Sequence, residues 1–278
     1  MNVPSVSVII AVYNKIDWLL LLLSGFEKQS FRDFEIVVAD DGSNKEFVHA
    51  LNEYIQTSPL RIQHVWHKDK GFRKTRILNK AVLQSKGEYI IFIDGDCLPD
   101  RNFVADHWYN RAPDTILAGR RANLSQKLTQ TLSAEKIRNG LLESTAFLRK
   151  VWVDSFRKIT NHAEKSVRLP RSIYRMLPAK SKGILGCNFS LHKSDLLQIN
   201  GFDTRYEAPA TGEDTDIDLR LRWAGKKIRL LRFQAIQFHI YHTRLDRPND
   251  NDRIFAEVMA QKKAVTSFGI REMQNDLA

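Results

Sequence analysis

Four short strand-like runs, each ending in polar residues, recur through the first hundred positions and limit the possible folds more than any other feature. They occupy residues 5–12, 33–40, 61–66 and 87–93. Helix-like stretches separate them, the clearest at residues 17–29 and 72–84. This alternation predicts an α/β fold with a Rossmann-like, mostly parallel sheet, right-handed crossovers and helices on both faces. The polar strand ends then meet at the carboxyl edge of the sheet, where ligands bind.

The fourth run closes on two carboxylates with a glycine between them, Asp94-Gly95-Asp96. Side chains alternate along an extended chain, so we expect Asp94 and Asp96 to project to the same side, roughly 6 to 7 Å apart. Carboxylates and substrate phosphates are the usual ligands of Mg²⁺ and Mn²⁺. The pattern predicts a divalent metal site. The alternative is a strand followed by an Asp-rich turn without a ligand.

Length and composition restrict the class of protein. The 278 residues, 43% of them hydrophobic, are enough for one large domain or two small ones. The two cysteines cannot form a disulfide framework, and no signal segment opens the sequence, so we expect a cytoplasmic protein. The longest apolar run, residues 18–23, is too short to span a bilayer. No Gly-x-Gly-x-x-Gly or Walker loop follows the strands, which argues against an ordinary dinucleotide or P-loop enzyme.

The net charge of +11 is concentrated in one segment. Residues 120–182 contain 15 Lys and Arg against 4 Asp and Glu, and the remaining residues balance. Nucleic acid, an anionic membrane surface or an acidic substrate would each suit such a segment. A solvated basic helix face without a partner is the fourth interpretation.

Six motifs occur in an order that resembles a known family. Residues 6–14, 37–43 and 92–96 resemble family 2 glycosyltransferases of the GT-A fold. Residues 186–190, 200–203 and 212–216 are similar to the acceptor half of galactosyltransferase-like members. The resemblance implies a single GT-A domain over residues 1–278. Its parts would be a nucleotide-binding half at 1–120, a basic helical insertion at 121–182, and an acceptor half with a C-terminal helix at 183–278.

The resemblance also implies which residues bind the donor. The base would be held by Ala11, Tyr13 and Asp41, and the ribose would face Asp94. Arg73, Arg76 and Asn79, at the start of the helix over residues 72–84, would reach the nucleotide; a basic helical turn without a ligand is the alternative. A carboxylate at position 41 could accept the imide N–H of uracil in a charge-assisted hydrogen bond.

The metal and the catalytic base follow from the same resemblance. Asp96 would bind Mn²⁺ or Mg²⁺, joined by a histidine from His239 or His242, with His242 preferred. Residues three apart on a strand face opposite sides, so both histidines can be ligands only if the chain turns between them. Asp214 would be the general base and Glu213 would position the acceptor. The alternative for this acidic cluster is that it caps a helix N-terminus.

Two segments differ from the family pattern. Galactosyltransferase-like relatives have a tryptophan before the Glu-Asp pair, and here that aromatic platform is either missing or replaced by Tyr206. Residues 125–182 have helix-like apolar spacing with Arg149, Lys150, Arg157 and Lys158 interleaved. This insertion is interpreted either as a membrane-binding amphipathic helix or as a lid on its own domain.

The sequence therefore predicts an inverting, metal-dependent glycosyltransferase. It would transfer a sugar from a UDP-linked donor to a glycan or lipid-linked acceptor in surface polysaccharide synthesis. We expect no nucleic acid partner, and we expect a place at the inner membrane face if the insertion meets lipid. A basic nucleic-acid-binding protein and a sugar nucleotidyltransferase are the alternatives.

Overall fold

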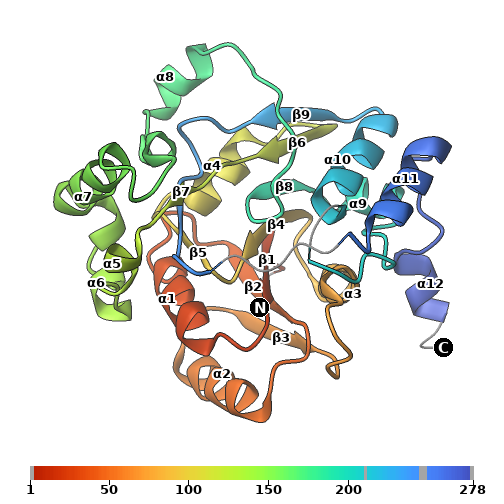
Figure 1. The fold of residues 1–278 in the computed structure, drawn as a ribbon, viewed down its shortest axis with the longest axis horizontal. Coiled ribbons are helices and arrows are strands. Elements are labelled where there is room, and N and C mark those ends of the chain that lie inside the picture. The colour runs from red at the N-terminus through yellow and green to blue at the C-terminus, as the bar shows by residue number, and fades with distance from the viewer. Residues whose placement is uncertain (1–2, 210–211, 244–248, 276–278) are drawn as a thin grey trace.

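The computed structural model describes residues 3–209, 212–243 and 249–275. Its frame is a seven-stranded sheet with the order β3-β2-β1-β4-β8-β6-β9 (Figure 1). These strands are β1 (Val6–Val12), β2 (Phe34–Asp40), β3 (Ile62–Trp66), β4 (Tyr89–Asp94), β6 (Thr115–Ala118), β8 (Phe189–His192) and β9 (Lys227–Leu230). The mixed α/β fold with a mostly parallel sheet, predicted from the alternating runs, is confirmed.

The register of the sheet brings the strand ends together. β1 pairs in parallel with both β2 and β4, so that Val12 lies opposite Asp40 and Ala11 lies opposite Asp94. In contrast, β8 runs antiparallel to β4 and to β6. Because of this reversal, residues that precede β8, such as Gly186, lie at the same edge of the sheet as residues that follow β4.

Apolar side chains at alternate strand positions fill two separate cores. In β1, Val8 and Ile10 belong to one core and Ile9 to the other. The first core lies beneath α1 (Ile16–Phe26), α2 (Lys45–Thr57) and α4 (Phe103–Asn110). The second lies beneath α3 (Lys74–Gln84), α9 (Lys193–Gln198) and α10 (Glu213–Trp223). Each face of the sheet is therefore covered by its own layer of helices.

A smaller sheet of three strands adjoins the carboxyl edge of β4. Its order is β5-β10-β7, formed by β5 (Cys97–Pro99), β10 (Gln237–His239) and β7 (Ala122–Asn123). β10 pairs antiparallel with β5, which places His239 opposite Cys97. Residues far apart in the sequence thereby come together directly after the Asp94-Gly95-Asp96 turn.

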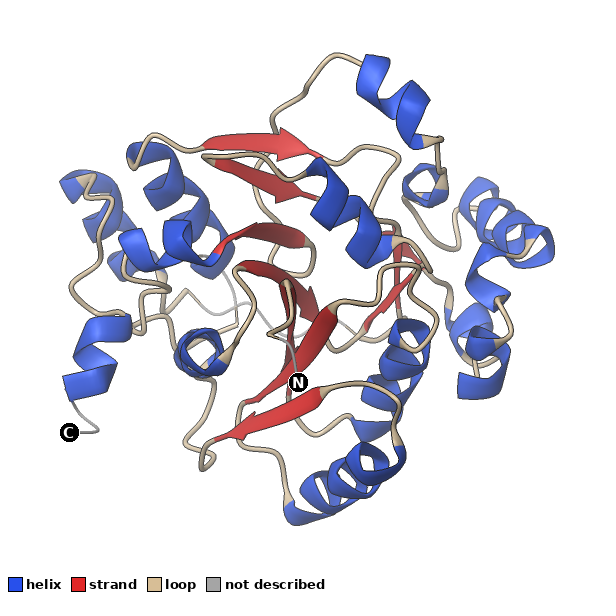
Figure 2. Ribbon diagram, turned by 180° about the vertical axis from the view of Figure 1, so that it is seen from behind, coloured by secondary structure: helices blue, strands red, loops and turns tan. Residues whose placement is uncertain are grey.

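The basic segment forms a group of short helices beside the sheet, on the side away from the C-terminal helices (Figure 2). They are α5 (Gln126–Thr129), α6 (Ala134–Arg138), η1 (Leu141–Glu143), α7 (Thr145–Phe156), η2 (Ala163–Ser166) and α8 (Arg171–Met176). Phe147 and Val151 of α7 are buried, and the Phe147 ring lies 5.3 Å from that of Phe238. The apolar stripe of α7 thus packs on its own domain.

The chain after β10 contains two helices, α11 (Asp252–Gln261) and α12 (Ile270–Asn275). The C-terminal helix expected in the acceptor half is two helices in the structure, because Lys262 adopts a left-handed conformation with φ of +49° and ends α11. After α11 the chain returns to an earlier part of the acceptor half, where the Thr204 N–H donates to the Phe268 carbonyl at 2.8 Å. Among the helices of the described residues, none has the length and apolar character needed to cross a membrane.

Candidate active site at the carboxyl edge of the sheet

Three of the predicted acidic residues surround a lysine. Lys74, in the first turn of α3, places its Nζ 3.0 Å from Asp94 Oδ1 and 2.7 Å from Glu213 Oε1. Asp214 also faces this cluster, whose small cavity is lined by Ala11. Burial disfavours the lysine charge, but Asp94, Glu213 and Asp214 together raise the pKa of Lys74 well above its usual value. Strand β4, helix α3 and helix α10 therefore contribute to one charged cluster.

Asp214 is buried at the start of α10. Its Oδ2 accepts a hydrogen bond from the Gly186 N–H at 2.7 Å. Burial and the adjacent Glu213 raise the pKa of Asp214 to about 7, although Lys74 and the Gly186 hydrogen bond lower it. A side chain at Gly186 would collide with the carboxylate, since a Cβ built there lies 2.2 Å from Asp214 Oδ1. A carboxylate whose pKa lies near neutrality is suited to accept a proton during catalysis.

The other acidic residues of α10 have structural partners. Asp216 forms an ion pair with Arg220 at 2.6 Å, and both side chains are 1% exposed. Asp218 pairs with Arg222 at 3.0 Å on the more exposed side of the helix. The acidic start of α10 thus consists of two residues that face the cluster and two that stabilise the helix and its contacts.

Asp96 lies beside the two histidines. Its Oδ2 is 3.2 Å from His239 Nε2 and 3.1 Å from His242 Nε2, and the three ligand atoms lie within 4.8 Å of one another. Burial opposes the ionised carboxylate, but hydrogen bonds with His239 and His242 hold the pKa of Asp96 well below its usual range. Strand β10 ends at His239, so the chain is free to turn and both histidines face Asp96.

The donor atoms of this group fit a divalent transition metal. His242 Nδ1 lies 2.8 Å from the Thr243 carbonyl, so a neutral imidazole that donates to this oxygen would present its Nε2 lone pair to an ion bound beside Asp96. Two imidazole nitrogens and one carboxylate oxygen suit divalent first-row transition metals. Asp94 does not join this set, because β4 ends there and the turn that follows places Asp96 with the histidines. The expectation that Asp94 and Asp96 project together therefore does not describe this turn.

The residues predicted to bind the base lie at the ends of β1 and β2. Asp41 accepts from the Arg73 N–H at 2.8 Å and lies 2.7 Å from His67 Nε2. Each carboxylate oxygen can accept a further hydrogen bond. Tyr13 is half exposed, and its hydroxyl donates to Asp69 Oδ2 at 2.9 Å.

The two arginines predicted to reach the nucleotide lie at the beginning of α3. Arg73 donates to the Lys68 carbonyl through Nη2, while its buried Nε has no hydrogen-bond partner among the described residues. Arg76 is partly buried one turn further along the same helix. The start of α3 thus carries Lys74 and both arginines, and the Arg73 N–H joins it to Asp41.

Two predicted residues lie apart from the others. Asn79 is fully buried, and its amide exchanges hydrogen bonds with the Phe202 backbone at 2.8 and 2.9 Å. It fastens the acceptor half to α3, so its amide is already engaged by protein. Tyr206 is also fully buried, directly beneath Gly212. Of the two alternatives for the aromatic platform, its burial favours a missing platform over a replacement by Tyr206.

Sequence reasoning missed Lys74 and His67. Lys74 stands between Arg73 and Arg76 in the run that the resemblance singled out, but its partner Glu213 is 139 positions away. His67 follows the end of β3 as Asp41 follows β2, which is the signal that could have identified it.

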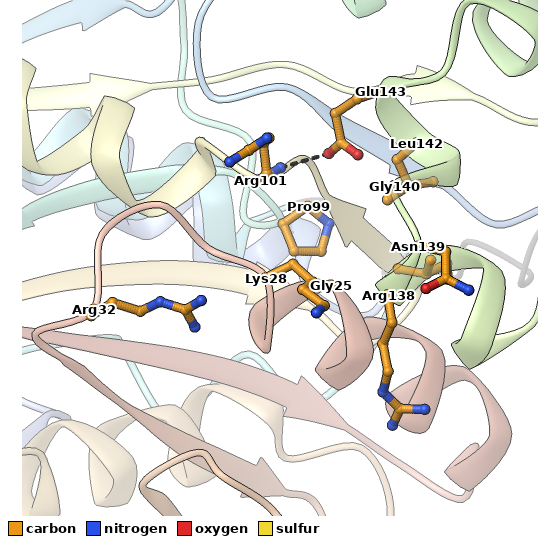
Figure 3. Close-up of a pocket in the computed structure, with 11 residues that line it drawn as sticks. Gly25, Lys28, Arg32, Pro99, Arg101, Arg138, Asn139, Gly140, Leu142 and Glu143 are labelled. Carbon is orange, nitrogen blue, oxygen red and sulfur yellow. Dashed lines mark hydrogen bonds between the residues drawn. The ribbon is translucent and has the colours of Figure 1, made fainter.

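A separate cavity of about 360 Å³ lies between α1, β5 and the α6–η1 turn (Figure 3). Basic residues border it, including Lys28 and Arg101. Arg138 at its rim is held by Glu27 at 2.8 and 2.9 Å. None of the predicted site residues lines this cavity, so it is distinct from the candidate active site.

The mostly parallel sheet with helices on both faces is the fold of the GT-A glycosyltransferases. Residues 7–146, half of the chain, match the family described as Glycosyl transferase family 2. The chain therefore belongs to the family 2 glycosyltransferases. Residues 172–243 match a second family, described as the N-terminal domain of galactosyltransferase. Membership in this family identifies the protein as a glycosyltransferase, and not as a nucleic-acid-binding protein or a nucleotidyltransferase.

Named relatives are bacterial glycosyltransferases. The chain is 33% identical over 102 residues to the poly(ribitol-phosphate) beta-N-acetylglucosaminyltransferase TarS of Staphylococcus aureus, covering 36% of this chain and 18% of TarS. It is 27% identical over 117 residues to the chondroitin synthase of Escherichia coli, covering 42% of this chain and 17% of that enzyme. The chain thus spans less than a fifth of either enzyme.

Solved structures confirm the fold. The mannosyltransferase PcManGT from Pyrobaculum calidifontis, solved with GDP-Man and Mn²⁺, has a TM-score of 0.57 at 17% identity, covering 92% of this chain and 69% of that one. The crystal structure of S. aureus TarS has a TM-score of 0.56 at 19% identity, covering 93% and 39% of the two chains. Both are GT-A glycosyltransferases, which establishes the predicted fold class.

Proposed function

We propose that this protein transfers a sugar from a UDP-linked donor to a glycan or lipid-linked saccharide, with a divalent metal and with inversion at the anomeric carbon, in the synthesis of a surface polysaccharide. The observation that carries the proposal is the meeting, at one sheet edge, of a carboxylate–histidine group and a carboxylate with a raised pKa. The carboxylate–histidine group would hold the metal that the donor diphosphate requires, and the carboxylate with a raised pKa would activate the acceptor hydroxyl.

The donor would lie across the ends of β1, β2 and β4. Asp41 has lone pairs left to accept the uracil imide N–H, and Ala11 and Tyr13 would border the base. Arg73 and Arg76 would approach the diphosphate from the start of α3, and Asp94 would face the ribose. Asn79 has no place in this set, since its amide is satisfied by Phe202.

The metal would be held by Asp96, His239 and His242. A divalent ion bound there supplies positive charge for the donor diphosphate and for the departing UDP. Imidazole ligands favour Mn²⁺ over Mg²⁺, which prefers oxygen.

Asp214 would take the proton of the acceptor hydroxyl. The acceptor oxygen forms a bond to the anomeric carbon while the bond to the UDP oxygen breaks, and UDP leaves with that electron pair. A single in-line displacement of this kind inverts the configuration. Glu213, beside Asp214 and paired with Lys74, would position the acceptor.

Calorimetric titration of UDP with and without Mn²⁺, followed by a hydrolysis screen of nucleotide sugars, tests the proposal. We expect UDP to bind only when Mn²⁺ is present, and a UDP-sugar to be hydrolysed fastest. Tight binding of UDP without metal, or a clear preference for another nucleotide, would contradict the assignment of the donor site.

Lys74 should set the pH dependence of the proposed reaction. The base must be ionised, so the rate of transfer should rise with pH through about 7 in the parent. Lys74 lowers the pKa of Asp214, so Lys74→Met should raise that pKa and move the rising part of the pH–rate profile to higher pH. Lys80→Met, on the same helix, is the matched control and should leave the profile in place. An unshifted profile in Lys74→Met would remove Lys74 from the base environment.

A further inference from the structure

The most exposed large apolar side chains lie in the basic insertion. Among the described residues, Met176 is 84% exposed and Phe156 is 77% exposed, more than any other large apolar side chain. Phe156 ends α7 and Met176 ends α8. Ile159 and Ile173, near them in the chain, are also exposed. Exposed apolar side chains that occur close together mark interaction sites more often than isolated ones do, and here they occur in two short stretches of the chain.

Basic side chains accompany these apolar residues. Arg157 and Lys158 directly follow Phe156, and Arg175 directly precedes Met176; all three are exposed. Residues 165–183 contain six Lys and Arg and no Asp or Glu. Helices α7 and α8 lie on the same side of the molecule in both views, opposite α12 (Figures 1 and 2). At the ends of both helices, exposed apolar and basic side chains are thus neighbours in the chain.

A cavity of about 270 Å³ lies beneath α8. Apolar and aromatic groups line it together with the cations Lys180, Arg229 and Arg232. The Arg229 guanidinium lies 5.3 Å from the Tyr174 ring centroid. Its buried Nε has no hydrogen-bond partner within the part of the chain that the structure describes. A buried donor without an acceptor, in a pocket of cations and apolar walls, suits the phosphate of an amphiphilic ligand.

We infer that the C-terminal end of α7 and helix α8 form a membrane-binding surface for an anionic phospholipid bilayer. The headgroup region takes up the exposed apolar side chains, which are Phe156, Ile159, Ile173 and Met176. The basic residues contact the anionic surface, and the cavity beneath α8 binds a headgroup phosphate. Apolar insertion combined with a basic surround is the physical basis of peripheral membrane binding.

Nucleic acid would use the cations, but it would leave the apolar tips in water. The inference deepens the proposed function and rests on it for the lipid-linked acceptor. Binding to the membrane itself requires neither donor nor metal.

Vesicle flotation tests the surface without substrate or metal. Vesicles of phosphatidylglycerol and phosphatidylcholine in equal amounts should carry the parent protein upward at low salt, and phosphatidylcholine alone should not. High salt should release the protein, because exposed charges are screened within about 10 Å at 0.1 M salt and over shorter distances at higher salt.

Three variants test the parts of the surface, and a fourth, on another side of the molecule, is the control. Phe156→Ser with Met176→Ser should weaken binding to the mixed vesicles roughly 10-fold or more. Changing Arg157, Lys158, Arg175 and Lys180 to Gln should weaken it roughly 100-fold or more. Arg229→Gln with Arg232→Gln tests the headgroup cavity and should weaken it roughly 10-fold. The matched control, Met259→Ser with Lys263→Gln on the α11 side, should bind as the parent does. All changed side chains reach solvent or the cavity, and circular dichroism checks the fold.

Several results would overturn the inference. The first is a parent protein that does not bind the mixed vesicles. The second is an apolar or charge variant that binds them as the parent does. The third is a control variant that loses as much binding as the apolar and charge variants lose. Retention of duplex DNA without vesicle binding would assign the surface to nucleic acid instead. Unchanged binding in the Arg229 and Arg232 variant would overturn the headgroup cavity.

Vesicle binding with no hydrolysis of any nucleotide sugar would count against the proposed enzyme alone, and hydrolysis without vesicle binding would count against the membrane surface alone.

Discussion

Replacing Asp214 with Asn is expected to lower the rate of sugar transfer roughly 100-fold or more while leaving UDP affinity unchanged. Asparagine keeps the size of the side chain but cannot accept the acceptor proton. Its amide can be placed with Oδ1 toward the Gly186 N–H, so the hydrogen bond that holds this residue is preserved. Transfer rates and calorimetric UDP titration, measured on the same preparation, check this result.

Asp218→Asn is the matched control for the Asp214 experiment. Asp218 lies on the same helix and pairs with Arg222, away from the Lys74 cluster. We expect it to retain near-parental transfer. A comparable loss of UDP binding in Asp214→Asn would place Asp214 in the nucleotide pocket, and unchanged transfer would show that another group accepts the proton.

Replacing Asp96 with Ala is expected to abolish turnover and the metal dependence of UDP binding while preserving the fold. The carboxylate is the only negatively charged member of the proposed metal set within the described residues. Without it, two imidazoles have to hold a divalent cation with no anionic ligand, and the affinity for the ion should fall below a useful range. Mn²⁺ titration, read by calorimetry without donor, measures the loss independently of activity.

The histidines allow the metal assignment to be refined. His242→Ala and His239→Ala should each weaken Mn²⁺ binding, and the stronger loss identifies the dominant nitrogen ligand. Asp17→Ala, at an exposed carboxylate on α1, is the control and should bind Mn²⁺ as the parent does. If Asp96→Ala binds Mn²⁺ and UDP like the parent, the metal lies elsewhere.

Much of the fold followed from local patterns. The strands near residues 5–12 and 33–40 are runs of apolar residues that only a two-sided core can bury, and β1 and β2 occupy almost these positions. The insertion was recognisable as helical from its apolar spacing and as basic from its Lys and Arg residues. The direction of β8 was not, because a four-residue strand carries no information about the direction of its partners.

The candidate site divides in the same way. Polar residues at strand ends identified Asp41, Asp94 and Asp96, since parallel strands bring their carboxyl ends to one edge whatever the rest of the chain does. Spacing within one helix could also suggest that Asn79 shares a face with Arg76. It could not reveal that the acceptor half covers this face and that the Phe202 backbone takes up the Asn79 amide.

The sequence by itself determined the alternating sheet, the residues at its carboxyl edge and the place of the excess positive charge, because each is set by neighbours in the chain. The tertiary structure decided which charges meet. Lys74 pairs with Glu213 only because α3 and α10 cover the same face of the sheet. His239 and His242 both reach Asp96 because β10 pairs with β5 and the chain leaves that strand after His239. The tertiary structure also decided that α7 buries its apolar stripe while Phe156 and Met176 are exposed to solvent. Only packing determines which side of an amphipathic helix is covered by the rest of the protein.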